Sequence, residues 1–312
     1  MPPDPSIPAV PHDAAPRPGA SPLAGMGWML LTGLLFVAVT ATVKHLGARI
    51  PAPEAAFLRY LLGLIFLLPV ARSLRRDWPG RRALAIFAGR GAVHAVGVML
   101  WFFAMTQIPM AEVTAINFLN PILITLAAAA LLGETLSLPR IMAVAVAFGG
   151  ALVVLRPGFR VIEPGHLAML GTASCFAASY MIAKRMSDSV SPSVVVAMLS
   201  VFVTLGLAPV AAAVWVWPSW VELGWLLLVA GFATTGHLTM TLAFRAAPIT
   251  VTQPVTFLQL VWATLLGWTL FGEPLDGWVI LGGAMILGAA VTITFRESRA
   301  RRRLRPEDLA GA

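Results

Sequence analysis

The chain has 312 residues, of which 58% are hydrophobic and 12% are charged, and its mean hydropathy is +0.84. A soluble domain usually carries about 25% charged residues, so this composition argues against a water-soluble protein and favours an integral membrane protein. The single cysteine, Cys175, excludes an intramolecular disulfide and a cysteine-based metal cluster.

Apolar stretches of about 18 residues or more, separated by short polar segments, are typical of transmembrane helices. The sequence predicts ten of them, at 24–45, 53–71, 83–106, 110–131, 138–156, 165–185, 192–216, 221–244, 249–271 and 276–295. Each has about 20 residues, enough to cross a hydrocarbon core of about 30 Å at about 1.5 Å per residue. The predicted fold class is therefore an all-α integral membrane protein.

The tails and loops predict how the chain is oriented. Residues 1–23, with eight prolines by position 22, are predicted to be a disordered tail, and 298–312 a basic tail. An even number of spans puts both termini on one side. That side holds 16 Lys and Arg residues against four on the other, which predicts that both termini are cytoplasmic. The basic tail therefore suits anionic lipid head groups rather than nucleic acid.

The chain also repeats itself weakly. At an offset of 139 residues, Gly133 and Glu134 coincide with Gly272 and Glu273. This predicts two repeats of five helices, at 24–157 and 158–297. Because five is odd, the second repeat must cross the membrane in the opposite orientation, and such inverted repeats are the architecture of alternating-access transporters.

The fifth helix of each predicted repeat carries two small residues spaced by four: Ala145 with Gly149, and Ala284 with Gly288. Small residues at this spacing let two membrane helices approach closely. We expect these two helices to make close contacts through these residues. Chance is the alternative explanation, because alanine and glycine are abundant in the chain.

The whole arrangement resembles the drug/metabolite transporter superfamily of the EamA type. The stretches that carry the resemblance are "VKHLG", "FLRYLLGLIFLLP", "WFFAMTQIPMAEVTAINFLNPILITLAAAALLGE" and "AFRAAPITVTQPVTFLQLVWATLLGWTLFGEPL", and it covers about 24–295. The resemblance implies secondary transport of a small organic metabolite across the bacterial inner membrane, often export, without ATP hydrolysis. Amino-acid-like, nucleobase-like, vitamin-like and metallophore-like solutes all fit.

On this interpretation the partners are a small-molecule solute and membrane lipid, without nucleic acid, and the chain acts as a monomer or homodimer. No cofactor and no metal is expected. The alternatives are an importer of a vitamin or nucleoside-like solute, a channel, and a membrane-embedded enzyme. The five histidines lack metal-ligand spacing and no nucleotide-binding loop is present, so an enzyme is disfavoured.

Ionisable groups within the spans are the first candidates for a site, because they are costly in a membrane. Arg59 is one, although snorkelling to the surface would also explain it. Arg90 and His94 share a helix face, and His237 lies on the corresponding helix of the second half. Either histidine could carry a proton, or be neutral and bonded to a neighbouring helix. The acids lie in tails, in loops or at helix ends, so proton coupling would have to use the histidines.

Amides and aromatic rings complete the candidate site. Asn117 and Asn120 share a face, and Gln259 is the repeat counterpart of Asn120. Neutral amides can donate and accept hydrogen bonds, although they can equally connect helices to each other. The remaining candidates are Gln253 for the solute, and Trp101, Phe102, Tyr180 and Trp262 as an apolar or stacking wall.

Overall fold

The computed structural model describes residues 21–70, 80–120, 122–124, 126, 138–159, 161–187, 192–247 and 252–303. The helical segments are α1 (Pro22–Leu46), α2 (Ala52–Gly63), η1 (Leu64–Val70), α4 (Arg81–Gln107), α5 (Met110–Asn117), α7 (Leu138–Leu155), α8 (Pro164–Ser187), α9 (Pro192–Ala213), α10 (Trp220–Ala246), η2 (Gln253–Thr256), α12 (Phe257–Phe271) and α13 (Gly277–Arg303). Most of the predicted N-terminal tail and Glu134 lie outside the described residues.

The ten α-helices in the described part of the chain correspond one by one to the ten predicted spans, which confirms the all-α membrane class. Within the described residues, four stretches are long and apolar enough to cross a membrane as single uninterrupted helices: Pro22–Leu46, Arg81–Gln107, Val194–Ala213 and Trp220–Met240. Others are shorter or interrupted. The predicted second span is the α-helix α2 followed by the 3₁₀ segment η1, and the predicted ninth span begins with the 3₁₀ segment η2.

The sequence explains these interruptions. α2 ends at Gly63, and glycine weakens a helix interior, while Pro69 within η1 has no backbone N–H. α5 ends at Asn117, four residues before Pro121, so the Asn117 carbonyl lacks the donor that a continuing helix would supply. The last helix, α13, is longer than predicted. It continues to Arg303 instead of ending near 295, because arginine is a good helix former.

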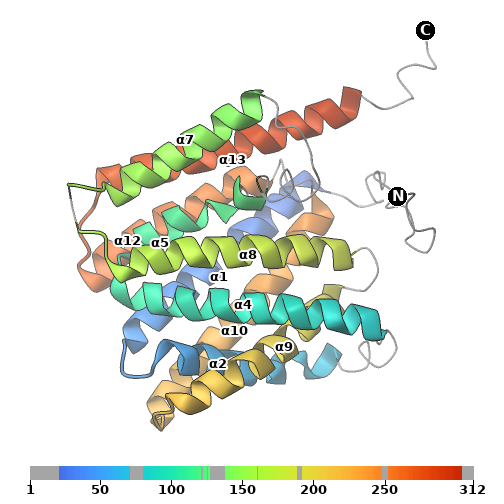
Figure 1. The fold of residues 1–312 in the computed structure, drawn as a ribbon, viewed down its shortest axis with the longest axis vertical. Helices are drawn as coiled ribbons and strands as arrows, with labels where there is room; N and C mark the ends of the chain where they lie inside the picture. Colours follow the sequence, from blue (N-terminus) through green and yellow to red (C-terminus); the bar gives the residue numbers. More distant parts are fainter. Residues whose placement is uncertain are drawn as a thin grey trace.

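Helices of the first half pair mainly with helices of the second half. The most extensive contacts join α1 to α10, α4 to α8 and α7 to α13, followed by those of α9 with both α2 and α4. Figure 1 shows α7 beside α13 at one edge of the molecule and α2 with α9 at the other, with α8 and α4 between them. The interior of the protein is therefore largely an interface between the two halves.

Glycines allow the closest of these approaches. A Cβ added to Gly97 on α4 would lie 2.9 Å from the Cys175 Cβ on α8, so these helices meet there without room for a side chain. Between α7 and α13, a Cβ at Gly150 would lie 2.6 Å from the Gly282 carbonyl oxygen. The prediction that Gly288 mediates this contact is wrong, since nothing lies within 4 Å of its Cβ position. The small residues that allow the close approach of α7 and α13 are therefore Gly150 and Gly282, where the two helices cross.

The helix directions alternate along the chain, so the two halves have opposite orientations. α1 ends, and α8 and α10 begin, at a single end of the bundle, which we call the Lys44 end. Among the described residues, three ion pairs lie there, Lys44–Glu273, Arg49–Glu222 and Arg156–Asp276, together with a contact between the Glu112 carboxylate and the His166 ring. Each of them joins a residue of the first half to a residue of the second half.

Candidate functional site

Buried and half-buried basic and aromatic side chains meet where α1, α2, α4, α8 and α10 come together. We call this group the central cluster. Its members are Phe36, Arg59, Tyr60, Arg90, His94, Trp101, Phe176, Ser179, Tyr180 and His237. Both halves of the chain contribute residues to it.

His94 is the hub of the central cluster. Its ring stacks on Phe176 with centroids 4.7 Å apart and an interplanar angle of 22°. Tyr60, Tyr180 and His237 surround it at centroid distances of 6.3, 6.4 and 6.4 Å. The ring nitrogen Nδ1 lies 3.0 Å from the Ser179 hydroxyl oxygen. His94 is 1% exposed, so it is fixed among rings rather than facing lipid.

The two arginines are buried as deeply. Arg59 and Arg90 are 5% and 4% exposed, so the snorkelling alternative for Arg59 is wrong in this structure. The Arg59 guanidinium carbon lies 3.7 Å from the centroid of the Tyr60 ring, in the geometry of a cation–π contact. Arg90 donates through Nε to the Ser179 hydroxyl at 3.4 Å and through a terminal nitrogen to the Val195 carbonyl at 3.1 Å.

The second half supplies the other histidine. His237 packs edge-on against Phe36 with a centroid distance of 5.2 Å, and Phe36 in turn contacts Trp101. Trp101 reaches Phe176 at 6.0 Å, which closes a ring of aromatic contacts. The histidines occupy unequal positions in the two repeats, yet the fold brings His94 and His237 together. The predicted residues Arg59, Arg90, His94, Trp101, Tyr180 and His237 therefore lie in one group.

The predicted amides form a separate group. Asn120 donates through Nδ2 to Asn117 Oδ1 at 2.8 Å, and Asn120 is 7% exposed. Its own Oδ1 is buried, and no hydrogen-bond donor of the described residues reaches it. Gln259 lies on α12 facing Gly33, and no hydrogen bond in the described part of the chain joins it to Asn117 or Asn120. The side chain of Gln253 lies outside the described part.

One predicted wall residue is misplaced and four cluster members were not predicted. The Trp262 ring is 37% exposed on α12, so it faces outward rather than lining the cluster. The missed members are Phe36, Tyr60, Phe176 and Ser179. A signal existed for Phe176: it lies four residues before Tyr180, on the helix face that meets the Arg90 and His94 pair.

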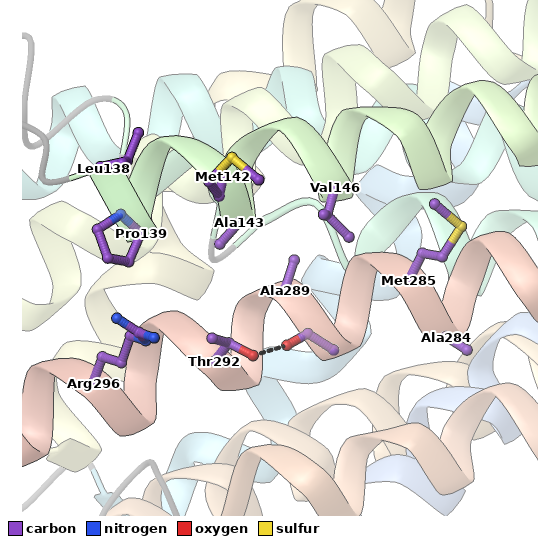
Figure 2. Close-up of a pocket in the computed structure, with 11 residues that line it drawn as sticks. Leu138, Pro139, Met142, Ala143, Val146, Ala284, Met285, Ala289, Thr292 and Arg296 are labelled. Carbon is purple, nitrogen blue, oxygen red and sulfur yellow. Dashed lines mark hydrogen bonds between the residues drawn. The ribbon is translucent and has the colours of Figure 1, made fainter.

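Two hollows lie away from the cluster. A groove of about 520 Å³ runs between α7 and α13, with apolar walls and Arg296 at one end. Figure 2 shows Met142, Val146 and Met285 along it, and the Thr292 hydroxyl bonded to a backbone carbonyl of its own helix. Met142 is 59% exposed, which places this groove on the outer face of the bundle.

The second hollow, of about 210 Å³, lies at the Lys44 end and is lined by acidic side chains, among them Glu112, Glu163, Glu273 and Asp276. Neither hollow is lined by a residue of the central cluster.

A ten-helix bundle whose halves run in opposite directions, with polar groups buried where the halves meet, defines a polytopic membrane protein built from inverted repeats. The model of the EamA-like transporter family matches residues 23–156 and, a second time, 163–295. The chain belongs to the EamA-like transporter family, and the resemblance noted in the sequence is confirmed.

Named transporters are similar to the chain over nearly their whole length. A riboflavin transporter of Rhizobium johnstonii is 29% identical, covering 90% of this chain and 94% of the relative. An S-adenosylmethionine uptake transporter of Rickettsia conorii is 27% identical, covering 90% and 96%. A pseudopaline exporter of Pseudomonas aeruginosa is 26% identical, covering 87% and 96%. A protein of known crystal structure shares the fold with a TM-score of 0.55 at 23% identity, covering 89% of this chain and 99% of that chain.

Proposed function

We propose that this protein is a secondary transporter of the bacterial inner membrane that carries a small organic solute by alternating access, with the central cluster as its binding site. One observation carries the proposal: the cluster is assembled from both halves. The first half supplies Arg59, Arg90 and His94, while the second supplies Tyr180 and His237. A rocking motion of one half against the other would therefore open and close this group of residues.

The ring content of the cluster suggests part of the solute. Aromatic side chains bind planar ligands by stacking and edge contacts, with centroid spacings like those seen around His94. Riboflavin and S-adenosylmethionine, named for two of the relatives, both contain fused heteroaromatic rings. We propose that the solute of this protein also has a planar ring, and that Asn117, Asn120 and Gln259 bind its polar edge.

The relatives support transport without fixing its direction. One is named for uptake and another for export. The family expectation favours export, and the names of the relatives give uptake of a vitamin-like or nucleoside-like solute equal support. The distribution of arginine and lysine supports cytoplasmic termini. Transport measured with a defined protein orientation decides between the two directions.

The test uses purified full-length protein in liposomes and a small-molecule extract of bacterial cells, analysed by mass spectrometry inside and outside the vesicles. We expect at least one ring-containing compound to cross only when protein is present. Tyr180→Ala should reduce that flux at least about fivefold, because an aromatic ring contact contributes about 1 kcal/mol beyond its buried area. Trp262→Leu, which changes an outward-facing ring, is the matched control and should keep wild-type flux.

Asn120→Ala and Gln259→Ala test the amides in the same assay. If both keep wild-type flux at normal protein levels, the amides are not part of the site. If no compound crosses in any vesicle orientation, or if Tyr180→Ala transports like the wild type, the proposed site is wrong.

A further inference from the structure

We infer that the transported solute carries a negative charge, a carboxylate or a phosphate, close to its planar ring. This inference rests on the proposed function and names the substrate class of the same site. It follows from an imbalance of charge in the middle of the molecule, where buried guanidinium groups lie among rings and hydroxyls.

The first step concerns the charges themselves. Arg59 and Arg90 are each at least 95% buried, and an arginine keeps its proton in proteins, so two positive charges lie in the interior. A buried charge is costly unless it is paired or hydrogen-bonded. In the described part of the chain, neither arginine forms an ion pair with a carboxylate. Their electrostatic neighbours include the two cluster histidines and the two tyrosines.

The acids of the spans are engaged elsewhere. Glu54, although only five residues before Arg59 on α2, accepts a hydrogen bond from the Val216 backbone N–H at 2.8 Å. Glu112 lies 2.5 Å from His166. Both carboxylates sit at the Lys44 end, where helices begin. The protein therefore has acids near its membrane-spanning core, and none of the described ones forms an ion pair with Arg59 or Arg90.

The second step concerns hydrogen-bond donors. A guanidinium has five N–H donors, and the bonds from Arg90 to Ser179 and Val195 use two of them. The fork of donors matches the two oxygens of a carboxylate or phosphate, which makes arginine the usual partner for these groups. The Ser179 hydroxyl accepts from Arg90, and in the tautomer where His94 Nδ1 also donates to it, its single proton is available to an anion.

The third step joins charge to ring. Arg59 lies against the Tyr60 ring, and Tyr60 and Tyr180 both flank His94. A solute that stacked on these rings would place a nearby substituent within reach of the guanidinium groups. An anionic substituent would neutralise charge that the protein leaves unpaired, whereas a cationic one would meet two positive charges. The site thus selects against cations as well as for anions.

The experiment compares matched pairs of probes that differ by one anionic group. Riboflavin is paired with flavin mononucleotide, adenosine with adenosine 5′-monophosphate, and indole with indole-3-acetate. Binding to the purified full-length protein in detergent is measured by titration calorimetry. We expect the anionic member of one pair or more to bind at least about tenfold more tightly, a difference of about 1.4 kcal/mol. The flavin and adenosine pairs report a preference for phosphate, and the indole pair reports a preference for carboxylate.

Variants assign the preference to the arginines. In Arg59→Gln and Arg90→Gln the anionic preference should fall to less than about threefold, because the charge-assisted hydrogen bonds are lost. Arg90→Lys keeps the charge and should keep part of the preference, even if Arg90→Gln fails to fold. Arg296→Gln removes an arginine from the outer groove and is the matched control, expected to bind as the wild type does.

The inference is overturned if no anionic member binds below about 1 mM, if the neutral member of each binding pair binds equally well, or if the preference survives in both glutamine variants. These results are separate from failure of the proposed function. If vesicles transport a neutral ring compound without charge preference, the proposed transport function is supported and the inference of an anionic solute is wrong. If anionic probes bind with an arginine-dependent preference but no compound crosses the vesicles, the anion inference is supported and the transport function is not.

Discussion

The Lys44 end and the central cluster differ in whether their positive charges are paired with carboxylates. At the Lys44 end, Lys44 lies 2.5 Å from Glu273 and also donates to the Ile108 carbonyl at 3.0 Å, while Glu273 accepts from the Met110 N–H. In the central cluster, Arg59 rests on a ring and Arg90 on a hydroxyl and a carbonyl. Among the described residues, the Lys44 end pairs Lys44, Arg49 and Arg156 with carboxylates of the other half, whereas the central cluster holds two arginines without a carboxylate partner.

The difference indicates separate roles for the two regions. Ion pairs that join the halves stabilise one arrangement of them, because their partners separate when the halves move apart at that end. Charges without acids stabilise no arrangement by themselves and can attract a ligand of opposite charge. The ion pairs of the Lys44 end therefore favour one arrangement of the halves, and the central cluster, the proposed binding site, keeps cations that can attract an anionic ligand.

Giving the central cluster its own acid should have the largest effect. Ser179→Asp would place a carboxylate beside Arg90 and His94, and this internal anion would compete with the solute. We expect transport to fall by about 100-fold, the value of one or two charge-assisted hydrogen bonds, while the protein level in the membrane is kept. Vesicle flux measures the effect, and Ser179→Asn, which is uncharged and of similar size, is the control. Equal losses in both variants would show that shape and not charge is responsible.

Removing one partner at the Lys44 end should have the next largest effect. Lys44→Met leaves Glu273 partly buried with the Met110 N–H but no cation, and should destabilise the protein by about 2 kcal/mol. Thermal unfolding of the detergent-solubilised protein measures this change. The double variant Lys44→Met/Glu273→Met should recover part of the loss, because the orphaned carboxylate is gone as well. A single variant as stable as the wild type would mean that this ion pair does not hold the end closed.

The exposed pair at the same end should have the smallest effect. Arg49 is 52% exposed, and Glu222 raises the pKa of the Arg49 guanidinium, so the pair is ionised at physiological pH. Glu222→Gln removes the charge but keeps the capping box with Ser219 at the start of α10. We expect a loss below about 1 kcal/mol that shrinks in high salt. Ser219→Ala, which removes the cap, should not respond to salt. The same unfolding assay at two salt concentrations separates the two contributions.

The spans and their inversion could be predicted because the membrane imposes them. A helix must be apolar and about 20 residues long to cross the bilayer, and an odd number of spans per repeat forces inversion. Arg59, Arg90, His94 and His237 could be singled out because charge and polarity are expensive in that setting. The interruptions within spans could not be predicted. Gly63 and Pro121 explain where α2 and α5 end only after the helix ends are known.

Which way a ring faces could not be predicted. Lipid tails are as apolar as a protein core, so hydropathy does not distinguish Trp101, which lies in the cluster, from Trp262, which faces outward. The meeting of His94 with His237 depends on how α4 and α10 are rotated about their axes, and that rotation is set by contacts between distant segments. The charged residues and histidines of the proposed site were therefore easier to predict than its rings or the arrangement of the whole group.

The seam between α4 and α8 has a practical consequence. Gly97 lies so close to Cys175 that no side chain fits between the helices, and the next residue, Phe176, stacks on His94. Cys175 is also the chain's single thiol. The unmodified protein thus has one natural position for a maleimide dye or spin label, next to the candidate site. Cys175 is partly exposed. The rate at which that thiol reacts would report, without any engineered cysteine, whether a bound solute changes the exposure of this seam.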